Sequence, residues 1–322
     1  MIAVTGATGL LGSHILARLR AGDLPMTALH RPGQDNELPP DVARIEGDIL
    51  DQPSLIDAFQ NANTVIHAAA YVSFNPRRRK KVFAVNVEGT KNVVDTCLQL
   101  GVKNLIHISS VAALGRRSGM RTTEETKWDN THASAYSESK HLAELEVFRG
   151  SEEGLNVSIV NPSVILSAAK PGRSSATLLD YAWNEKPFYT DGMLNYVDAR
   201  DVAEAIYKLC VTPMNGEKFI LSAGTVSFKD FFSGVAHHFG KNSPRFRINA
   251  TTAALAGWTQ ELMGWLLNRE PLVTRESARM AVQSFQYENK KAREQLNLQF
   301  QTLESTIAWC CADYMRNVNP NK

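Results

Sequence analysis

The segment IAVTGATGLLG, residues 2–12, decides the fold of this chain. Its first four residues are apolar or small and predict a short buried strand. Gly6, Gly9 and Gly12 follow at the spacing GxxGxxG, and residues 10–20 continue with a helical pattern. Such a turn lets the backbone approach a pyrophosphate closely, while the helix N-terminus directs its amides and positive dipole end at it. The segment therefore predicts a dinucleotide-binding turn.

The chain beyond this turn alternates short apolar strands with helices. Strands are predicted at MTALHR, VARIEGD, NTVIHAAA, NLIHISSV, LNVSIVNPS and, later, KFILSAG. This rhythm predicts an α/β fold, a doubly wound parallel sheet of the Rossmann type with helices on both faces. We expect a dinucleotide-binding domain over residues 1–165. A smaller, mostly helical substrate-binding region over residues 166–322 is expected to be partly interleaved with it. Within this region DARDVAEAIYKLC predicts a helix capped by Asp198 or Asp201.

Composition limits the function classes. The 322 residues are 43% hydrophobic with a formal net charge of +2, which gives no electrostatic case for nucleic acid or acidic lipid as a partner. No run reaches the length of a membrane span, and no signal peptide is recognised at the start. The four cysteines form no metal-type pair and the histidines no metal spacing, so we expect no metal and a cytoplasmic location. A stripe at residues 255–266 is interpreted as core or subunit packing, with contact to a membrane or apolar substrate as the alternative.

The ends of the second and third strands indicate which cofactor is bound. The second strand ends in His30 and Arg31, where an acidic residue would bind the adenosine ribose and an arginine a 2′-phosphate. This favours NADP over NAD, unless Arg31 is only a surface residue. Asp48 and Ile49 follow the third strand and could border the adenine. Asp48 could instead cap the helix that begins near Pro53.

The segment SAYSESK, residues 134–140, contains the candidate catalytic pair. If this segment is helical, Tyr136 and Lys140 share one face. A phenol has an ordinary pKa near 10, and a neighbouring cation would lower the pKa of Tyr136 toward a useful range for proton transfer. Ser109 and Ser110 end the fifth strand, where ligands of open α/β sheets bind, and a hydroxyl there could hold a reacting oxygen. The other serines, including Ser137 and Ser139, are interpreted as helix-start and surface residues.

Taken in order, the motifs resemble those of the extended short-chain dehydrogenase/reductase family. The resembling segments are TGATGLLG, GDILD, HAAA, NVEGT, ISSVAALG, YSESK and NPSVIL, over nearly the whole chain. The resemblance implies that Tyr136 is the acid/base, that Lys140 binds the nicotinamide ribose and tunes Tyr136, and that Ser110 polarises a carbonyl. It implies these further cofactor contacts: Gly6, Thr8, Gly9, Leu10, Leu11, Gly12, His30, Arg31, Asp48, Ile49, Ala68, Ala69, Ala70, Asn86, Pro162, Ser163 and Val164. Asn86 is expected to be more architectural than chemical.

Two details favour one branch of this family. Asn161 stands before Pro162, where nucleotide-sugar epimerases usually carry arginine, and AALG follows where they carry VYG. With Arg31, this resembles dihydroflavonol-reductase-like and hydroxysteroid-dehydrogenase-like members, which reduce ketones or oxidise secondary alcohols. The expected function is therefore NAD(P)-dependent hydride transfer to or from a small molecule, in a homodimer by resemblance. The alternatives are an epimerase or dehydratase with tightly bound NAD, and a dinucleotide-binding redox sensor without turnover. The loop SAAKPG departs from the family pattern, so substrate identity is not carried over.

Overall fold

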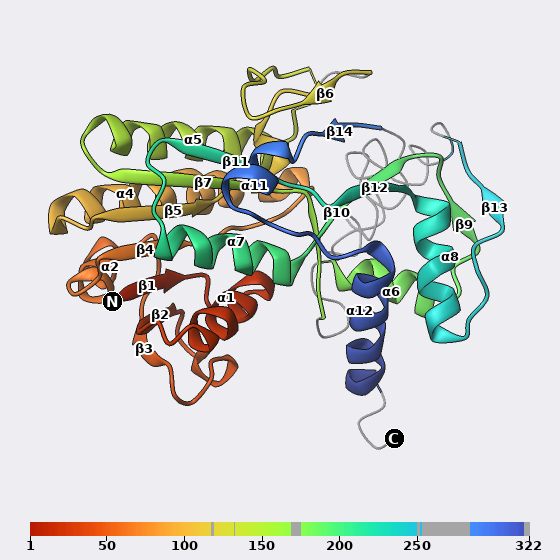
Figure 1. The fold of residues 1–322 in the computed structure, drawn as a ribbon, viewed down its shortest axis with the longest axis horizontal. Coiled ribbons are helices and arrows are strands. Elements are labelled where there is room, and N and C mark those ends of the chain that lie inside the picture. Colours follow the sequence, from red (N-terminus) through yellow and green to blue (C-terminus); the bar gives the residue numbers. More distant parts are fainter. Residues whose placement is uncertain (117–118, 132, 169–174, 250–251, 253–283, 319–322) are drawn as a thin grey trace.

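A seven-stranded parallel sheet forms the centre of the computed structural model (Figure 1). The structure describes residues 1–116, 119–131, 133–168, 175–249, 252 and 284–318. The strand order across the sheet is β3-β2-β1-β4-β5-β7-β11. All seven strands were predicted from the sequence, and the α/β, doubly wound class is confirmed. The strands are β1 (Ile2–Thr5), β2 (Met26–His30), β3 (Ala43–Glu46), β4 (Thr64–His67), β5 (Asn104–Ile108), β7 (Asn156–Pro162) and β11 (Glu217–Leu221).

Helices cover both faces of this sheet because its inner strands alternate apolar side chains between two cores. Ile106 of β5 packs into the core formed with α1 (Leu10–Ala21) and α7 (Ala199–Val211). Its neighbour Leu105 faces the opposite core. The helices on that side are α2 (Gln52–Phe59), α4 (Gly89–Leu100) and α5 (Ala135–Glu152). A strand buried on both faces reads as a continuous apolar run, which is why these strands were recognisable.

The second half of the chain builds a smaller layer and also returns to the main sheet (Figure 1). In the main sheet β11 pairs in parallel with β7, and α7 packs against α1. The smaller layer is a three-stranded sheet packed on three helices through a third apolar cluster. Its elements are β8 (Val164–Leu166), β10 (Met193–Asp198), β12 (Gly224–Ser227), α6 (Ala176–Trp183), α8 (Phe228–Phe239) and α12 (Leu303–Val318).

Short elements connect these layers. Between β4 and α4 lie the 3₁₀ turn η2 (Pro76–Arg78), the helix α3 (Arg79–Phe83) and the π-helical turn η3 (Ala84–Glu88). Two small strand pairs and one helix complete the description: β6 (Arg121–Thr122) with β14 (Gln286–Tyr287), β9 (Phe188–Tyr189) with β13 (Phe246–Arg247), and α11 (Lys290–Gln295). The remaining 3₁₀ turns are η1 (Asp35–Glu37) and η4 (Val111–Ala113). The apolar stripe at residues 255–266 lies outside the described residues.

Two helix starts test the predicted caps. The Asp198 carboxylate accepts from the backbone N–H of Arg200 at 2.8 Å, so Asp198 is the N-cap of α7 as one of two predicted candidates. Helix α2 begins after Asp51, and the Asp48 carboxylate instead accepts from the Leu50 N–H at 2.9 Å. The alternative in which Asp48 caps this helix is therefore wrong, because the Asp48 side chain closes the turn at residues 48–50, which precedes the helix N-cap at Asp51.

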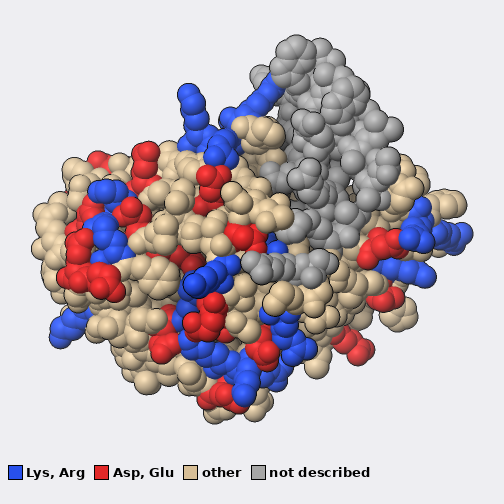
Figure 2. Space-filling model, turned by 90° about the horizontal axis from the view of Figure 1, so that it is seen from above, with Lys and Arg blue, Asp and Glu red and all other residues tan. Residues whose placement is uncertain are grey.

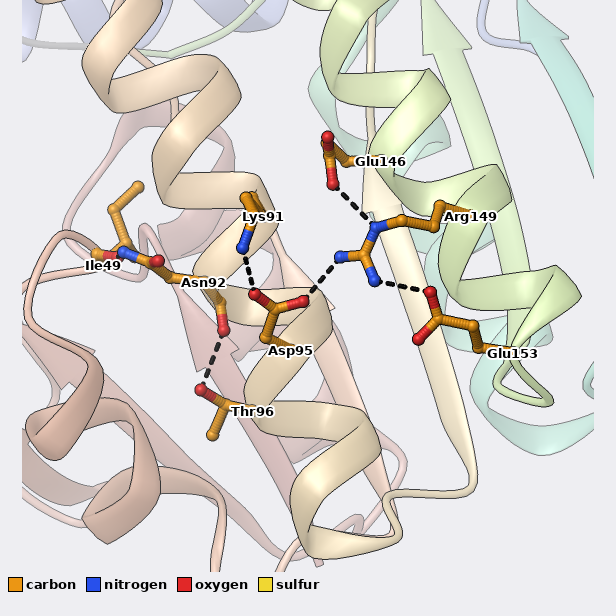
Figure 3. Close-up of polar contacts among 8 residues, drawn as sticks. All are labelled: Ile49, Lys91, Asn92, Asp95, Thr96, Glu146, Arg149 and Glu153. Carbon is orange, nitrogen blue, oxygen red and sulfur yellow. Dashed lines mark hydrogen bonds and ion pairs between the residues drawn. The ribbon is translucent and has the colours of Figure 1, made fainter.

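Arg149 joins α5 to α4 on the outer surface of the sheet layer (Figure 3). Its guanidinium contacts Asp95 at 2.6 Å, Glu146 at 3.0 Å and Glu153 at 2.8 Å. Asp95 also accepts from Lys91 at 2.5 Å, one turn earlier on α4. Each such exposed ion pair contributes little alone, but one arginine shared by three carboxylates sets the relative position of the two helices.

Charges of both signs are mixed on the face of the molecule seen from above (Figure 2). Figure 2 shows lysine and arginine interspersed with aspartate and glutamate on the face that it presents. Of the helices that the structure describes, none has the length and apolar character needed to cross a bilayer. Within the same described ranges, no three His, Cys, Asp or Glu side chains converge as metal ligands.

Candidate active site

The glycine turn presses against the segment that follows β4. Gly6 has φ +70°, and a Cβ built on it would lie 2.5 Å from the Ala69 nitrogen. A Cβ on Gly12 would lie 2.2 Å from the Gly6 carbonyl oxygen. Gly9 is the N-cap of α1, and its N–H donates to the Gly6 carbonyl at 2.9 Å. The cradle admits no side chain at Gly6 or Gly12 and leaves the helix N-terminus open, which fits a dinucleotide pyrophosphate.

Arg31 is connected to the glycine turn by Gln34, a residue that the sequence did not indicate. The Gln34 Oε1 atom accepts from the Thr8 hydroxyl at 3.2 Å and from the Arg31 guanidinium at 3.4 Å. Arg31 is exposed, whereas His30 is buried with its Nδ1 3.1 Å from the Arg31 carbonyl oxygen. Gln34 therefore connects the glycine turn to the end of β2. No motif signals Gln34, because it lies in an irregular loop.

Asp48 and Ile49 hold the loop after β3 against α4. The Ile49 side chain is buried in the core, close enough to Gly89 that a Cβ there would lie 2.6 Å from it. The Ile49 carbonyl accepts from the Asn92 amide at 3.0 Å. These contacts use the Ile49 side chain and carbonyl in packing, while the Asp48 carboxylate is engaged with Leu50.

Asn86 fixes the segment after Ala68–Ala70 against α5. It lies in the π-helical turn η3, and its Oδ1 accepts from the Tyr71 N–H at 2.7 Å. Its Nδ2 donates to the Tyr71 carbonyl at 3.0 Å and to the Ser139 hydroxyl at 2.9 Å. The Ser139 hydroxyl in turn donates to the Tyr136 carbonyl at 2.7 Å. A π-helical turn often marks a functional position, and here it directs the Asn86 amide at the Tyr71 backbone and the Ser139 hydroxyl.

A buried polar chain continues from Asn86 to the strand that precedes the glycine turn. The Thr90 hydroxyl donates to the Asn86 carbonyl at 2.6 Å and lies 3.0 Å from His67 Nε2. Because that hydroxyl donates to Asn86, His67 Nε2 carries the proton, and His67 Nδ1 accepts from the Thr5 hydroxyl at 2.7 Å. Burial lowers the pKa of His67 to about 3, so this ring is neutral. The chain thereby ties β1, β4 and α4 to α5, which carries Tyr136 and Lys140.

Two serines predicted to be surface residues are buried. Ser137 and Ser139 are both 0% exposed. Ser134 caps α5, where its hydroxyl accepts from the Ser137 N–H at 2.9 Å and the Ser137 hydroxyl accepts from the Ser134 N–H at 2.6 Å. The helix-start interpretation of Ser134 is confirmed, and the surface interpretation of Ser137 and Ser139 is wrong. Small hydroxyls are needed here because α5 packs closely on its neighbours at this end.

Ser110, Tyr136 and Lys140 meet at the carboxyl end of β5. The Ser110 hydroxyl accepts from the Ala112 N–H at 3.1 Å and lies close enough to the Tyr136 phenol to lower the pKa of that phenol. Lys140, 2% exposed, lies one turn later on α5, and its ammonium donates to the Ile108 carbonyl at 2.7 Å. The Phe74 ring packs edge-on against the Tyr136 ring, with centroids 6.1 Å apart. The three groups therefore share one end of the sheet with the glycine turn.

The pKa of Tyr136 is shifted in the direction opposite to the one expected from the sequence. Burial raises the pKa of Tyr136 above its ordinary value, and the hydrogen bond with Ser110 only partly opposes this rise. Burial also lowers the pKa of Lys140 to about 8. The predicted lowering of the Tyr136 pKa by a neighbouring cation is wrong for this state, because burial of the phenol raises its pKa more than the neighbouring Ser110 lowers it. A raised pKa keeps the phenol protonated at neutral pH but makes it a weaker proton donor, because an acid catalyst works best when its pKa lies near the operating pH.

The Pro162–Val164 segment follows β7 at the same end of the sheet. The Ser163 N–H donates to the Leu221 carbonyl at 2.9 Å, which fixes this segment to β11. The Ser163 hydroxyl is buried without a hydrogen-bond partner within the described structure, and Val164 is 40% exposed. A buried hydroxyl without a partner is uncommon in proteins. Its position beside the expected nicotinamide site fits a group that a bound cofactor would satisfy.

Comparison with known proteins agrees with this class of fold and site. Residues 2–222 match the model of the NAD dependent epimerase/dehydratase family. The chain belongs to this family, and its sheet and site make it an extended short-chain dehydrogenase/reductase with a NAD-binding Rossmann fold.

Individual relatives are reductases and dehydrogenases. The chain is 26% identical to a putative dihydroflavonol 4-reductase of Synechocystis sp., over 95% of this chain and 92% of that protein. It is 23% identical to 3beta-hydroxysteroid-dehydrogenase/decarboxylase isoform 1 of Arabidopsis thaliana, over 91% of this chain and 74% of that protein. The crystal structure of gox2253 superposes with a TM-score of 0.85 at 29% identity, covering 100% of this chain and 99% of that one.

Proposed function

We propose that this protein is an NADP-preferring reductase that converts the carbonyl group of a small molecule into a secondary alcohol. The observation that carries the proposal is that Ser110, Tyr136 and Lys140 lie together at one end of the sheet, with Ser110 close enough to the Tyr136 phenol to lower its pKa and the buried Lys140 one turn along α5. All three stand at the sheet end where the glycine turn opens. The reductase and dehydrogenase names of the relatives support the same reaction class.

Each of the three side chains has a distinct role in this proposal. The Tyr136 phenol donates its proton to the oxygen that gains negative charge as the carbonyl is reduced. The Ser110 hydroxyl donates a hydrogen bond to the same oxygen and stabilises that charge. The Lys140 ammonium holds the cofactor ribose and stabilises the phenolate left after proton donation. When bound, the nicotinamide supplies the hydride.

Cofactor choice in this proposal rests on the end of β2. Arg31 is an exposed guanidinium whose Nε donates to Gln34, and Gln34 is tied to Thr8 of the glycine turn. A guanidinium at this place matches the 2′-phosphate of NADP, and an acidic residue that would bind the unphosphorylated ribose is absent from the end of this strand. The glycine cradle would hold the pyrophosphate, and Pro162, Ser163 and Val164 would border the nicotinamide.

The test is to follow NADPH absorbance with the purified protein and a panel of dihydroflavonols, 3-ketosteroids and simple aryl ketones. The proposal expects stoichiometric loss of NADPH and formation of the alcohol. Tyr136→Phe is expected to lower kcat about 10²–10⁴-fold, the usual contribution of a positioned acid. Tyr207→Phe is the matched control, because this tyrosine packs with Arg18 in the core on the other face of the sheet.

Two outcomes would reject the proposal. Turnover of a nucleotide sugar without net change in NAD would assign the protein to the epimerases and dehydratases. A dinucleotide-binding sensor would be favoured if the protein bound NADPH tightly but reduced no compound of the panel, and if Tyr136→Phe left NADPH binding unchanged.

A further inference from the structure

One turn after Lys140 on α5, the buried carboxylate of Glu144 accepts hydrogen bonds from three donors, which lie on or next to three strands. Glu144 is 1% exposed and follows Lys140 by one turn of α5. Its Oε1 accepts from the Ser109 hydroxyl at 2.5 Å and from the Asn161 amide at 2.6 Å. Its Oε2 accepts from the Lys218 ammonium at 2.7 Å. These donors come from the ends of β5 and β7 and from β11.

The same cluster is connected to the backbone of Ser110 through the Asn161 side chain. The Asn161 Nδ2 that donates to Glu144 also lies 2.9 Å from the Ser110 carbonyl and donates to it. Ser109 and Ser110 are consecutive, so Glu144 holds one by its hydroxyl and the other through Asn161. An ionised carboxylate at a buried position is costly unless it is hydrogen-bonded and paired, and Glu144 meets both conditions. We expect a protein to retain a buried carboxylate, despite the free-energy cost of its burial, where the carboxylate holds neighbouring groups in position.

Glu144 also affects the charge of Lys140. Burial lowers the pKa of Lys140, and the Glu144 carboxylate opposes that change. The other groups near Lys140 are His67 of β4, His107 of β5 and Tyr136. The two histidines stay neutral because burial holds their pKa values well below the ordinary value. Lys218 and His141 stand near Glu144 itself, and burial lowers the pKa of His141. Glu144 is thus the anion nearest to Lys140 among these groups.

We propose that Glu144 is a positioning residue of this site. It fixes the Ser109–Ser110 end of β5 through Ser109 and Asn161, and it keeps the Lys140 ammonium charged without touching substrate or cofactor. The signal was present in the sequence, since Tyr136, Lys140 and Glu144 repeat at intervals of four residues on one helix. A glutamate at that spacing is usually a surface residue, so burial is needed to give it this role. The inference rests on the proposed function of Tyr136 and Lys140.

The test is Glu144→Gln, which keeps the size and one carbonyl acceptor but removes the charge. The alkaline limb of the kcat profile is expected to move to lower pH by about one unit, the size of one nearby charge. We expect kcat to fall about tenfold, because Ser110 is held less well, with KM for the carbonyl substrate changed far less. Glu146→Gln is the matched control, since Glu146 lies two residues away and contacts Arg149 on the outer surface (Figure 3).

The double variant Glu144→Gln/Lys218→Met covers the case in which the single variant does not fold. It removes both charges of the Glu144–Lys218 pair together, so neither member of that pair is left buried without the other. The same shift to lower pH is expected in this variant. An unchanged pH profile and kcat in whichever of the two variants folds would overturn the proposal.

A second measurement separates this inference from the proposed function. The Lys140 side chain is titrated by NMR with lysine labelled at ¹³Cε, and its signal is assigned with Lys140→Arg. The pKa of Lys140 is expected to be lower in Glu144→Gln than in the wild type and unchanged in Glu146→Gln. This readout needs no substrate, so it tests the role of Glu144 even if no carbonyl compound is reduced. Equal titration of Lys140 in all three proteins would overturn the proposal.

Discussion

Asp201 is predicted to destabilise the folded protein at neutral pH. It is 4% exposed on α7, and burial raises its pKa from 3.8 to about 6. Its Oδ2 accepts from the Gln301 N–H at 2.9 Å, which opposes only part of that rise. A carboxyl group whose pKa is higher in the folded than in the unfolded state binds more protons when folded. The free energy of unfolding therefore falls as pH rises from about 4 to about 6 and stays lower above that range.

The size of the effect follows from this shift. A rise of about two pKa units corresponds to about 3 kcal/mol of unfolding free energy lost at pH 7.5. Asp201→Asn removes the charge and retains an oxygen that can accept from Gln301. We expect this variant to be more stable than the wild type by about 2–3 kcal/mol at pH 7.5, or about 3–4 °C in Tm for a chain of this length. Near pH 4 the two proteins should melt together.

Calorimetric melts of both proteins at pH 4, 5, 6 and 7.5 provide the measurement. Asp198→Asn is the matched control, because Asp198 is also buried but its carboxylate accepts from Arg200 at 2.6 and 3.0 Å and from Thr306 at 2.9 Å. This variant should melt lower than the wild type, since the amide presents N–H groups to those donors. A gain for Asp201→Asn that is the same at pH 4 and pH 7.5 would refute the electrostatic reasoning, as would a loss at pH 7.5.

The other two predictions concern the cofactor site. Gly12→Ala should weaken NADPH binding at least tenfold in a fluorescence titration, because the new Cβ would lie 2.2 Å from the Gly6 carbonyl oxygen and force the turn open. Gly234→Ala is the control and should leave NADPH binding unchanged, since its Cβ would approach only a flexible Ile307 methyl group at 3.3 Å. Arg31→Ala should weaken NADPH binding about 10–100-fold, the usual range for a charge-assisted contact, and leave NADH binding unchanged; equal weakening of both would place Arg31 outside the 2′-phosphate site.

Local sequence patterns were sufficient for the parallel sheet. The inner strands of the main sheet are short, mostly apolar runs, and a strand buried on both faces is largely apolar, so its own residues reveal it. The same holds for the glycine turn, because close approach of two backbones excludes side chains at fixed spacing. Asp198 could be named as a candidate cap from its place before an apolar helical pattern. These features depend on neighbours within a few residues.

Other features of the candidate site depend on contacts between distant segments. The sequence could pair Tyr136 with Lys140 by helical spacing, but it did not show that Lys140 is directed at the Ile108 carbonyl. The burial that raises the Tyr136 pKa comes from elements far away in the chain, which is why the predicted direction was wrong.

The sequence by itself determined the order of strands and helices, the dinucleotide turn and the presence of Ser110, Tyr136 and Lys140 at one end of the sheet. Only the tertiary structure decided that Glu144 is buried, that Gln34 joins Arg31 to Thr8, and that Ser139 belongs to a polar chain reaching β1. The physical reason is that a pattern of apolar residues specifies which face of an element is buried. The hydrogen-bond partner and pKa of a polar side chain are set by whichever distant groups the fold brings within 3 Å or so of it.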